Sequence, residues 1–272
     1  MDPSSVAVVT GASRGIGRAV AVEMANRGFD VIATMRDPSA GRGLADETTG
    51  RLEVARLDVT DPASIELPEG LRVLVNNAGV EDNNLPIEMM PPDAWRRMFE
   101  TNVFGLVEVT ARAVPLMRAG GGGVICNITS SSILAPVPFL GAYRASDAAV
   151  SVLAESLLAE AAAFGIRVIE VMPGPIETDM LATSDRPAAA IDHEPYRVLA
   201  EAMWESRQQI RESYTPASEA ARRIVDAIAD DDGPLRYGCD DMSEAMLAGW
   251  RATASDEDWL ASMRPMFTPI SD

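Results

Sequence analysis

Two residues whose types and spacing bear on acid–base chemistry, Tyr143 and Asp147, lie four positions apart in the sequence. In a helix, that spacing places both side chains on one face, one above the other. A tyrosine has an ordinary pKa near ~10 and is most effective in proton transfer when that pKa approaches the operating pH. A neighbouring carboxylate raises the pKa instead, so donating a proton to a carbonyl should suffer less than removing one from an alcohol.

A glycine-rich loop near the N-terminus follows a predicted strand and opens a predicted helix. Gly11, Gly15 and Gly17 form the pattern G-x-x-x-G-x-G, which lets a backbone turn tightly and approach a pyrophosphate at a helix N-terminus. The same stretch spells G-x-S-x-G around Ser13, which is the nucleophile-elbow pattern of hydrolases. A hydrolase also needs a histidine late in the chain. The single histidine, His193, has no predicted strand before it, so nucleotide binding is favoured.

Two arginines are placed where a dinucleotide site distinguishes NADP(H) from NAD(H). The second predicted strand ends in Met35, at the position where a carboxylate would bind the adenosine ribose of NAD. Arg36 follows it, and Arg14 lies in the glycine loop. Guanidinium groups suit bidentate contacts with phosphate, so these residues predict a preference for NADP(H) over NAD(H). The alternative is that Arg36 only opens a surface turn.

The elements that must position these residues alternate along the chain. Short runs rich in β-branched residues predict strands at 5–10, 30–35, 52–58, 71–77, 123–129, 167–172 and 235–238. Helical patterns occur near 15–28, 93–118, 143–164 and 216–230. This alternation predicts an α/β fold, with a Rossmann-like doubly wound parallel sheet of about seven strands and helices on both faces.

The chain contains no linker that would divide it, so we expect a single domain over residues 1–272. Residues at about 179–215 interrupt the alternation and are expected to form a lid-like insertion. Residues at about 241–272 form a C-terminal extension.

Composition limits the partners and the compartment. A formal net charge of -18 argues against nucleic acid and anionic membranes, which need clustered basic residues. The chain has neither a membrane-spanning apolar run nor the basic start of a signal peptide, so we expect a cytoplasmic protein. Cys126 and Cys239 are expected to be buried and reduced, and no metal site is expected beside a single histidine. All 23 basic residues are arginine, so no lysine can serve as a base or activate a tyrosine.

Taken in order, the motifs resemble those of the short-chain dehydrogenase/reductases, which exchange hydride between NAD(P) and a carbonyl or alcohol. "TGASRGIG" (10–17) is similar to the family's cofactor loop, and "LDVTD" (57–61) to its adenine-contacting segment. "NNAG" (76–79) is similar to its signature after the fourth strand, and "PGPIET" (173–178) to its nicotinamide loop. With the two arginines, the expected cofactor-binding residues are Gly11, Ser13, Arg14, Gly15, Ile16, Gly17, Arg36, Asp58, Val59, Asn77, Ala78, Gly79, Tyr143, Pro173, Gly174, Ile176 and Thr178.

The resemblance also implies a catalytic set of Ser130, Tyr143, Asn102 and Asp147. Ser130 precedes Tyr143 by thirteen residues, the family's usual separation of the substrate-orienting serine from the catalytic tyrosine. Asn102, in "TNVFG", falls where the family has its catalytic asparagine. Asp147 stands where the family motif Tyr-x-x-x-Lys has a lysine that holds the nicotinamide ribose and lowers the tyrosine pKa. We therefore expect impaired acid–base catalysis, unless a distant arginine folds in beside Asp147.

Three functions remain open on the sequence. The first is an NADP(H)-dependent oxidoreductase acting on the carbonyl or alcohol of an apolar small molecule, since "LRYGCDDM" (235–242) and the insertion resemble the steroid and retinol dehydrogenase branch. The second is a non-redox NADP(H)-binding sensor or scaffold, and the third a non-redox enzyme that reuses Ser130 and Tyr143. Family members commonly pair through helices corresponding to 102–118 and 143–164, which implies a homodimer or homotetramer.

Overall fold

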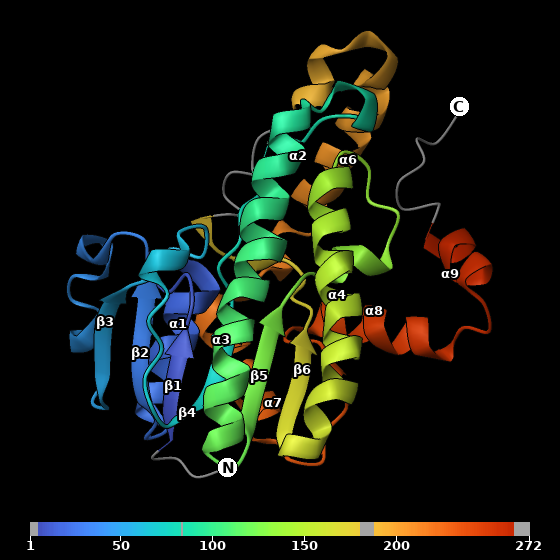
Figure 1. Cartoon of the computed structure of the whole chain (residues 1–272). Coiled ribbons are helices and arrows are strands. Elements are labelled where there is room, and N and C mark those ends of the chain that lie inside the picture. Colours follow the sequence, from blue (N-terminus) through green and yellow to red (C-terminus); the bar gives the residue numbers. More distant parts are fainter. Residues whose placement is uncertain (1–4, 83, 180–187, 264–272) are drawn as a thin grey trace.

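A parallel β-sheet forms the centre of the computed structural model, which describes residues 5–82, 84–179 and 188–263 (Figure 1). Its strands follow the order β3-β2-β1-β4-β5-β6-β9, and every neighbouring pair is parallel. The strands are β1 Val6–Val9, β2 Asp30–Met35, β3 Leu52–Arg56, β4 Leu71–Asn76, β5 Gly123–Ile128, β6 Ile166–Val171 and β9 Arg236–Tyr237. The predicted strands and the predicted doubly wound sheet are confirmed.

Helices cover both faces of the sheet, which explains why its central strands are apolar almost throughout. On one face lie α1 (Gly15–Asn26) and α7 (Ala217–Ala229), which pack against each other and the sheet. On the other lie α3 (Leu106–Ala119) and α4 (Gly141–Ala161), side by side in Figure 1. The four helices predicted from periodicity are confirmed.

The helix predicted at 93–118 consists of three parts that follow one another without a break. The first is α2 (Pro92–Phe99), the last is α3, and between them Glu100–Gly105 forms a π-helical turn. Such turns widen a helix locally and are frequent at functional sites.

Several short elements carry too little periodicity to be predicted. The insertion contains α6 (Arg197–Gln209), which buries only Ala200 and Met203, so its pattern is mainly polar. The C-terminal extension contains α8 (Asp241–Ala252) and α9 (Asp256–Met263). A two-stranded sheet joins β7 (Ile176–Glu177) to β8 (Thr215–Pro216) at the two ends of the insertion. Residues 180–187 of the predicted insertion and 264–272 of the predicted extension lie outside the described residues.

Cys126 and Cys239 are both buried and free, as predicted from their separation. Within the described ranges, no helix combines the length and apolar character needed to cross a membrane.

Candidate active site

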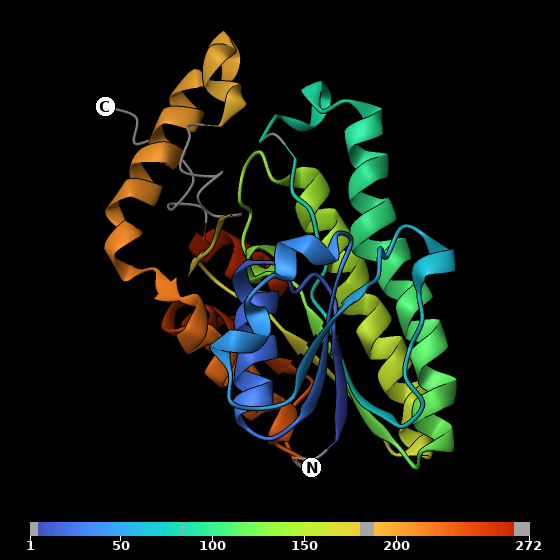
Figure 2. The same cartoon turned by 90° about the vertical axis from the view of Figure 1, so that its left-hand side faces the viewer.

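A cavity of about 650 Å³ lies at the carboxyl ends of the parallel strands. Strand β1 has β2 on one side and β4 on the other, so the chain winds away from this point in both directions. The loops that follow β1 and β4 therefore diverge and leave a crevice between them, where ligands of doubly wound sheets bind. Helix α6 stands at the end of the molecule toward which the strands point (Figure 2).

The cavity brings together every predicted site residue except Gly17. The predicted residues that line it are Gly11, Ser13, Arg14, Gly15, Ile16, Arg36, Asp58, Val59, Asn77, Ala78, Gly79, Asn102, Ser130, Tyr143, Asp147, Pro173, Gly174, Ile176 and Thr178. Gly17 is buried in α1, where a Cβ would come within 2.3 Å of Nδ2 of Asn77. The absence of a side chain at Gly17 thus allows α1 to pack closely against the loop after β4. His193 does not line the cavity that contains Ser13, which removes the hydrolase alternative.

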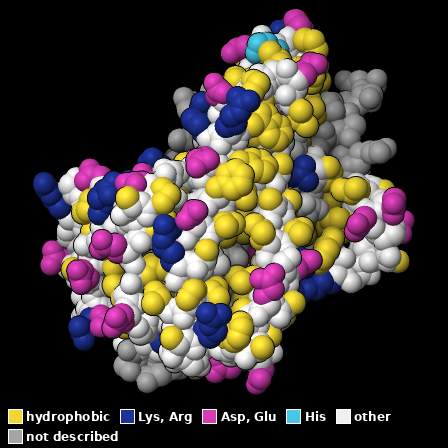
Figure 3. All heavy atoms as spheres, viewed as in Figure 1, with side chains coloured by type: hydrophobic (Ala, Val, Ile, Leu, Met, Phe, Trp, Pro, Cys, Tyr) yellow, Lys and Arg dark blue, Asp and Glu magenta, His cyan; other side chains and the backbone are white. Residues whose placement is uncertain are grey.

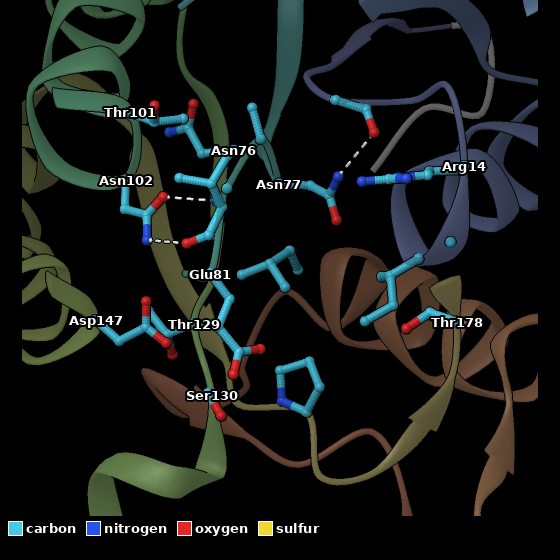
Figure 4. A pocket seen from close by; sticks show the side chains of 18 of the residues that line it. Arg14, Asn76, Asn77, Glu81, Thr101, Asn102, Thr129, Ser130, Asp147 and Thr178 are labelled. Carbon is cyan, nitrogen blue, oxygen red and sulfur yellow. Dashed lines mark hydrogen bonds between the residues drawn. The ribbon is translucent and has the colours of Figure 1, made fainter. Parts of the chain in front are cut away.

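The glycine loop has the geometry of an anion-binding cradle. Gly11 and Gly15 adopt positive φ angles of 67° and 58°, which side-chain-bearing residues rarely adopt. The residue at the N-cap of α1, Arg14, makes no capping hydrogen bond, so the first N–H groups of the helix are left for a ligand. Nδ2 of Asn77 donates to the carbonyl oxygens of Thr10 and Gly11 over 2.9 and 3.2 Å, which fixes the loop to the end of β4. Figure 4 shows the bond to Gly11. This cradle fits the pyrophosphate of a dinucleotide.

The two predicted phosphate-binding arginines lie at this end of the cavity, and both are exposed. Nη1 of Arg14 lies 4.0 Å from Oδ2 of Asp179, in a pair that is about 70% exposed on each side. Surface pairs of this kind contribute little free energy, so Arg14 can exchange its partner for a phosphate. Oδ1 of Asp58 accepts hydrogen bonds from N–H and Oγ1 of Thr60, which shapes the loop that follows β3.

Asn102 connects the loop after β4 to the start of α4. It lies in the π-helical turn, and its Oδ1 accepts from the N–H of Val80 over 2.8 Å. Its Nδ2 donates to the carbonyl oxygen of Val80 over 3.0 Å (Figure 4). The same Nδ2 donates to Oγ of Ser146 over 3.1 Å. Both ends of the amide are thus engaged, and Asn102 holds the segment that leads to Glu81.

Two hydroxyl groups meet at the opposite end of the cavity from the glycine loop. Ser130 follows β5, and its Oγ accepts from the N–H of Ser132 over 3.2 Å. Tyr143 lies in the first turn of α4. Burial raises the pKa of Tyr143 well above its ordinary value, the charges of Asp147 and Glu81 raise it further, and a hydrogen bond with Ser130 opposes them. Tyr143 therefore stays protonated and can act as a proton donor.

Asp147 is a buried carboxyl in this cavity, with 5% of its surface exposed. Burial raises its pKa well above 3.8, a hydrogen bond from Tyr143 opposes that rise, and the charges of Glu170 and Glu81 add to it. Its Oδ2 atom is buried and has no hydrogen-bond partner. An orphaned acceptor of this kind fits the hydroxyl groups of a bound ribose.

In the part of the chain that the structure describes, no distant arginine compensates the negative charge of Asp147. Arg236 of β9 reaches the adjacent turn of α4, where it donates to Oγ of Ser151 over 3.0 Å. Its Nε is paired with Oε2 of Glu170 over 3.0 Å. No arginine among the described residues forms an ion pair with Asp147, so none of them takes the place of the missing lysine.

Sequence reasoning missed Glu81, a half-buried carboxyl at the same end of the cavity. Burial raises its pKa, while the charge of Arg207 and a hydrogen bond from Asn84 oppose that rise. Arg207 comes from α6, so the insertion supplies a side chain to the cavity. A signal existed in the sequence, because Glu81 stands two positions after the "NNAG" motif.

The raised pKa of Asp147 predicts how stability depends on pH. The folded protein binds this proton more tightly than the unfolded chain, so the contribution of Asp147 to stability is greatest below the ordinary value of 3.8 and is lost as the pH rises through the folded-state pKa. Asp147→Asn removes the cost of a buried charge, and we expect it to stabilise the protein by about 2 kcal/mol at about pH 8. Urea denaturation across this pH range measures the difference.

The gain from Asp147→Asn should shrink as the pH is lowered toward about 4, where the wild-type carboxyl is also neutral. Asp46→Asn is the matched control, because Asp46 is an exposed aspartate outside the cavity. A stability gain that is equal at both ends of the pH range would show that charge burial is not its cause.

Comparison with known proteins gives consistent results. Residues 5–188 match the family model of the short chain dehydrogenases. The chain is 38% identical over 191 residues to the uncharacterized oxidoreductase YusZ of Bacillus subtilis, covering 66% of this chain and 68% of that protein. A short chain dehydrogenase of Burkholderia cenocepacia, solved with NADP, superimposes with a TM-score of 0.76 at 25% identity, covering 99% of this chain and 100% of the other. A 7α-hydroxysteroid dehydrogenase, solved with NADH and 7-oxo-glycochenodeoxycholic acid, superimposes with a TM-score of 0.72 at 27% identity. The match covers 85% of this chain and 92% of the other.

Proposed function

The chain belongs to the short-chain dehydrogenase/reductase family, and we propose that it is an NADP(H)-dependent oxidoreductase acting on the carbonyl or alcohol group of an apolar small molecule. The observation that carries the proposal is the division of one cavity into two ends. A glycine cradle with Arg14 and Arg36 lies at one end, and the hydroxyls of Ser130 and Tyr143 lie at the other. The first end suits a phosphorylated dinucleotide, and the second suits a carbonyl oxygen.

When bound, NADP(H) supplies or accepts the hydride. Ser130 orients the carbonyl oxygen, and Tyr143 holds a proton on its hydroxyl and donates that proton to the same oxygen. Asp147 accepts hydrogen bonds from the cofactor ribose through its orphaned Oδ2. Its charge also keeps the pKa of Tyr143 high, so Asp147 impairs the proton transfer.

An apolar substrate is supported by the side chains around the catalytic end of the cavity. The apolar residues there are Val80, Leu106, Leu140, Val150 and Pro173. We propose that the insertion acts as a lid over this end through its described residues 188–215, which is supported by the contribution of Arg207 from α6 to the cavity. The 7α-hydroxysteroid dehydrogenase was solved with a steroid ligand, whose ring system is likewise largely apolar.

Titration of the purified protein with NADPH and with NADH, followed by nicotinamide fluorescence, tests the cofactor. Arg36→Leu is expected to raise the Kd for NADPH by about 10–100-fold, because a charge-assisted contact with the 2′-phosphate is lost. The Kd for NADH should stay within about twofold, since NADH lacks that phosphate. Arg42→Leu is the control, because Arg42 is an exposed arginine outside the cavity. Equal losses for both nucleotides would contradict 2′-phosphate recognition.

We propose that the protein forms a homodimer or homotetramer through the face covered by α3 and α4. Hydrophobic side chains gather on this face in Figure 3. The exposed hydrophobic residues on these helices and the turns that adjoin them are Phe104, Val107, Val152, Leu153, Leu158 and Phe164. Large apolar patches on a protein surface commonly mark an interaction site.

Val152→Glu is expected to shift the protein to monomer, because a carboxylate is placed in the proposed apolar interface. Light scattering coupled to size-exclusion chromatography measures the mass. Val198→Glu is the matched control, because Val152 and Val198 are 61% and 63% exposed and Val198 lies on α6 instead. A wild-type mass of a single chain, or an unchanged oligomer mass for Val152→Glu, would contradict this proposal.

A further inference from the structure

We infer that the cavity discriminates between the two oxidation states of its nicotinamide cofactor and binds NADP⁺ more tightly than NADPH, through the carboxyl groups of Asp147 and Glu81. The inference rests on the proposed function, since it takes a nicotinamide dinucleotide as the ligand. Beyond that function, it names the oxidation state that the site prefers and the residues that cause the preference.

The orientation of the cofactor follows from where the charges of the cavity lie. Phosphate groups belong at the glycine cradle, because helix N-terminal N–H groups and Arg14 are there. Figure 4 shows Arg14 on one side of the cavity and Asp147 on the opposite side, with Ser130. With its phosphates at the cradle and its 2′-phosphate at Arg36, the dinucleotide must extend its nicotinamide half toward Asp147.

Among the described residues, the charges that surround the nicotinamide end are predominantly negative. Glu170 of β6 faces Asp147, but its charge is offset by Arg236 of β9, at 3.0 Å. Glu81, from the loop after β4, faces Asp147 as well, and the charge of Arg207 acts on it from α6. Asp147 itself has no basic partner among the described residues, so each of the other two carboxyls has a cation and Asp147 has none.

The two oxidation states of nicotinamide differ in charge at this end alone. The oxidised ring carries one positive charge, and the reduced ring is neutral, while the phosphate groups are the same in both. A ligand form is favoured only by interactions that it makes and the other form lacks. A buried carboxylate with an unpartnered oxygen supplies such an interaction, because screening by water is weak there. The site therefore selects the cationic ring.

Protonation links this selection to pH. Burial and the neighbouring charges of Glu170 and Glu81 raise the pKa of Asp147, while the Tyr143 hydrogen bond lowers it, so the carboxyl is neutral at low pH. A neutral carboxyl does not distinguish the two rings by charge. The preference for NADP⁺ should therefore increase as the pH rises through the pKa of Asp147, and NADP⁺ binding at lower pH should release a proton.

Isothermal titration calorimetry with NADP⁺ and, separately, NADPH at about pH 6 and about pH 9 tests the inference. For the wild type at the higher pH we expect a Kd for NADP⁺ at least about tenfold below that for NADPH, and a smaller ratio at the lower pH. Asp147→Asn should bring the ratio close to one at both pH values. Glu81→Gln should also bring this ratio of Kd values closer to one. The Glu81→Gln variant tests the inference by itself if Asp147→Asn does not fold.

Glu155→Gln is the matched control, because Glu155 lies two turns after Asp147 on α4, does not line the cavity and pairs with Arg236. It should keep the wild-type ratio. Equal affinity for both forms in the wild type, or a ratio that neither Asp147→Asn nor Glu81→Gln changes, would overturn this inference and leave the proposed function standing. Failure of both nucleotides to bind would overturn the proposed function, and the inference with it.

Discussion

Asp147→Lys is expected to raise kcat/KM for NADPH-dependent reduction of apolar ketones by about 10²-fold or more, which is the lower range of what general acid catalysis contributes. The substitution removes a charge that raises the pKa of Tyr143 and places a positive charge in its stead. The new ammonium would lie near Glu81 and Glu170, the two carboxyls whose charges act on Asp147, so it would not be a buried charge without partners. Initial rates of NADPH consumption over a panel of apolar ketones measure the effect.

Asp147→Met separates the two parts of this effect. It removes the carboxylate and supplies an unbranched side chain of about the length of lysine, but it adds no positive charge. We expect its rate to fall between those of the wild type and Asp147→Lys. If Asp147→Lys binds NADPH and still reduces no ketone faster than the wild type does, electrostatic tuning of Tyr143 does not limit the reaction. A complete lack of turnover in all three proteins, with tight NADPH binding, would instead favour a non-redox binding protein.

Tyr143→Phe is expected to lower kcat by about 10²–10⁴-fold in the Asp147→Lys background, because the proton donor to the carbonyl oxygen is removed. In the wild-type background the loss should be smaller, since Asp147 already keeps the tyrosine pKa far above the operating pH. The difference between the two losses is the coupling between the residues, which a double-mutant cycle of kcat values measures.

The control for this prediction is Tyr196→Phe, in which the lost hydroxyl is hydrogen-bonded to Glu88 over 2.7 Å, and Tyr196 does not line the cavity. It should leave kcat within about twofold of its background, as expected for a surface change outside the site. The Kd for NADPH should also change little in Tyr143→Phe, so that the loss appears in kcat. Equal losses in both backgrounds would mean that Asp147 does not control the chemistry of Tyr143.

Asp147 has opposite consequences for cofactor binding and for proton transfer. A carboxylate near the nicotinamide favours the oxidised cofactor, which is the form that alcohol oxidation requires. The same carboxylate raises the pKa of Tyr143, which hinders removal of a proton from an alcohol. Asp147→Lys should reverse both effects together, so the binding ratio and the reduction rate can be compared in one variant.

The sequence alone determined the sheet and the glycine cradle, because both depend on local patterns. Apolar runs such as Leu71–Asn76 are buried on both faces, and the alternation with amphipathic helices leaves few other arrangements. The glycines of the cradle are required by backbone angles at Gly11 and Gly15, which is again a local property. The departure from the family motif at Asp147 is likewise read directly from the sequence.

The charges that surround Asp147 could not be predicted from the sequence, because the residues that carry them are distant in sequence and meet through the sheet. Glu170 comes from β6, Glu81 from the loop after β4, and Arg207 from a helix whose pattern is mostly polar. No local pattern tells whether Arg236 pairs with Glu170 or with Asp147, since both carboxyls lie near the same side of α4. Long-range packing assigns that cation to Glu170, and it therefore leaves Asp147 without a basic partner among the described residues and its buried Oδ2 without a hydrogen bond.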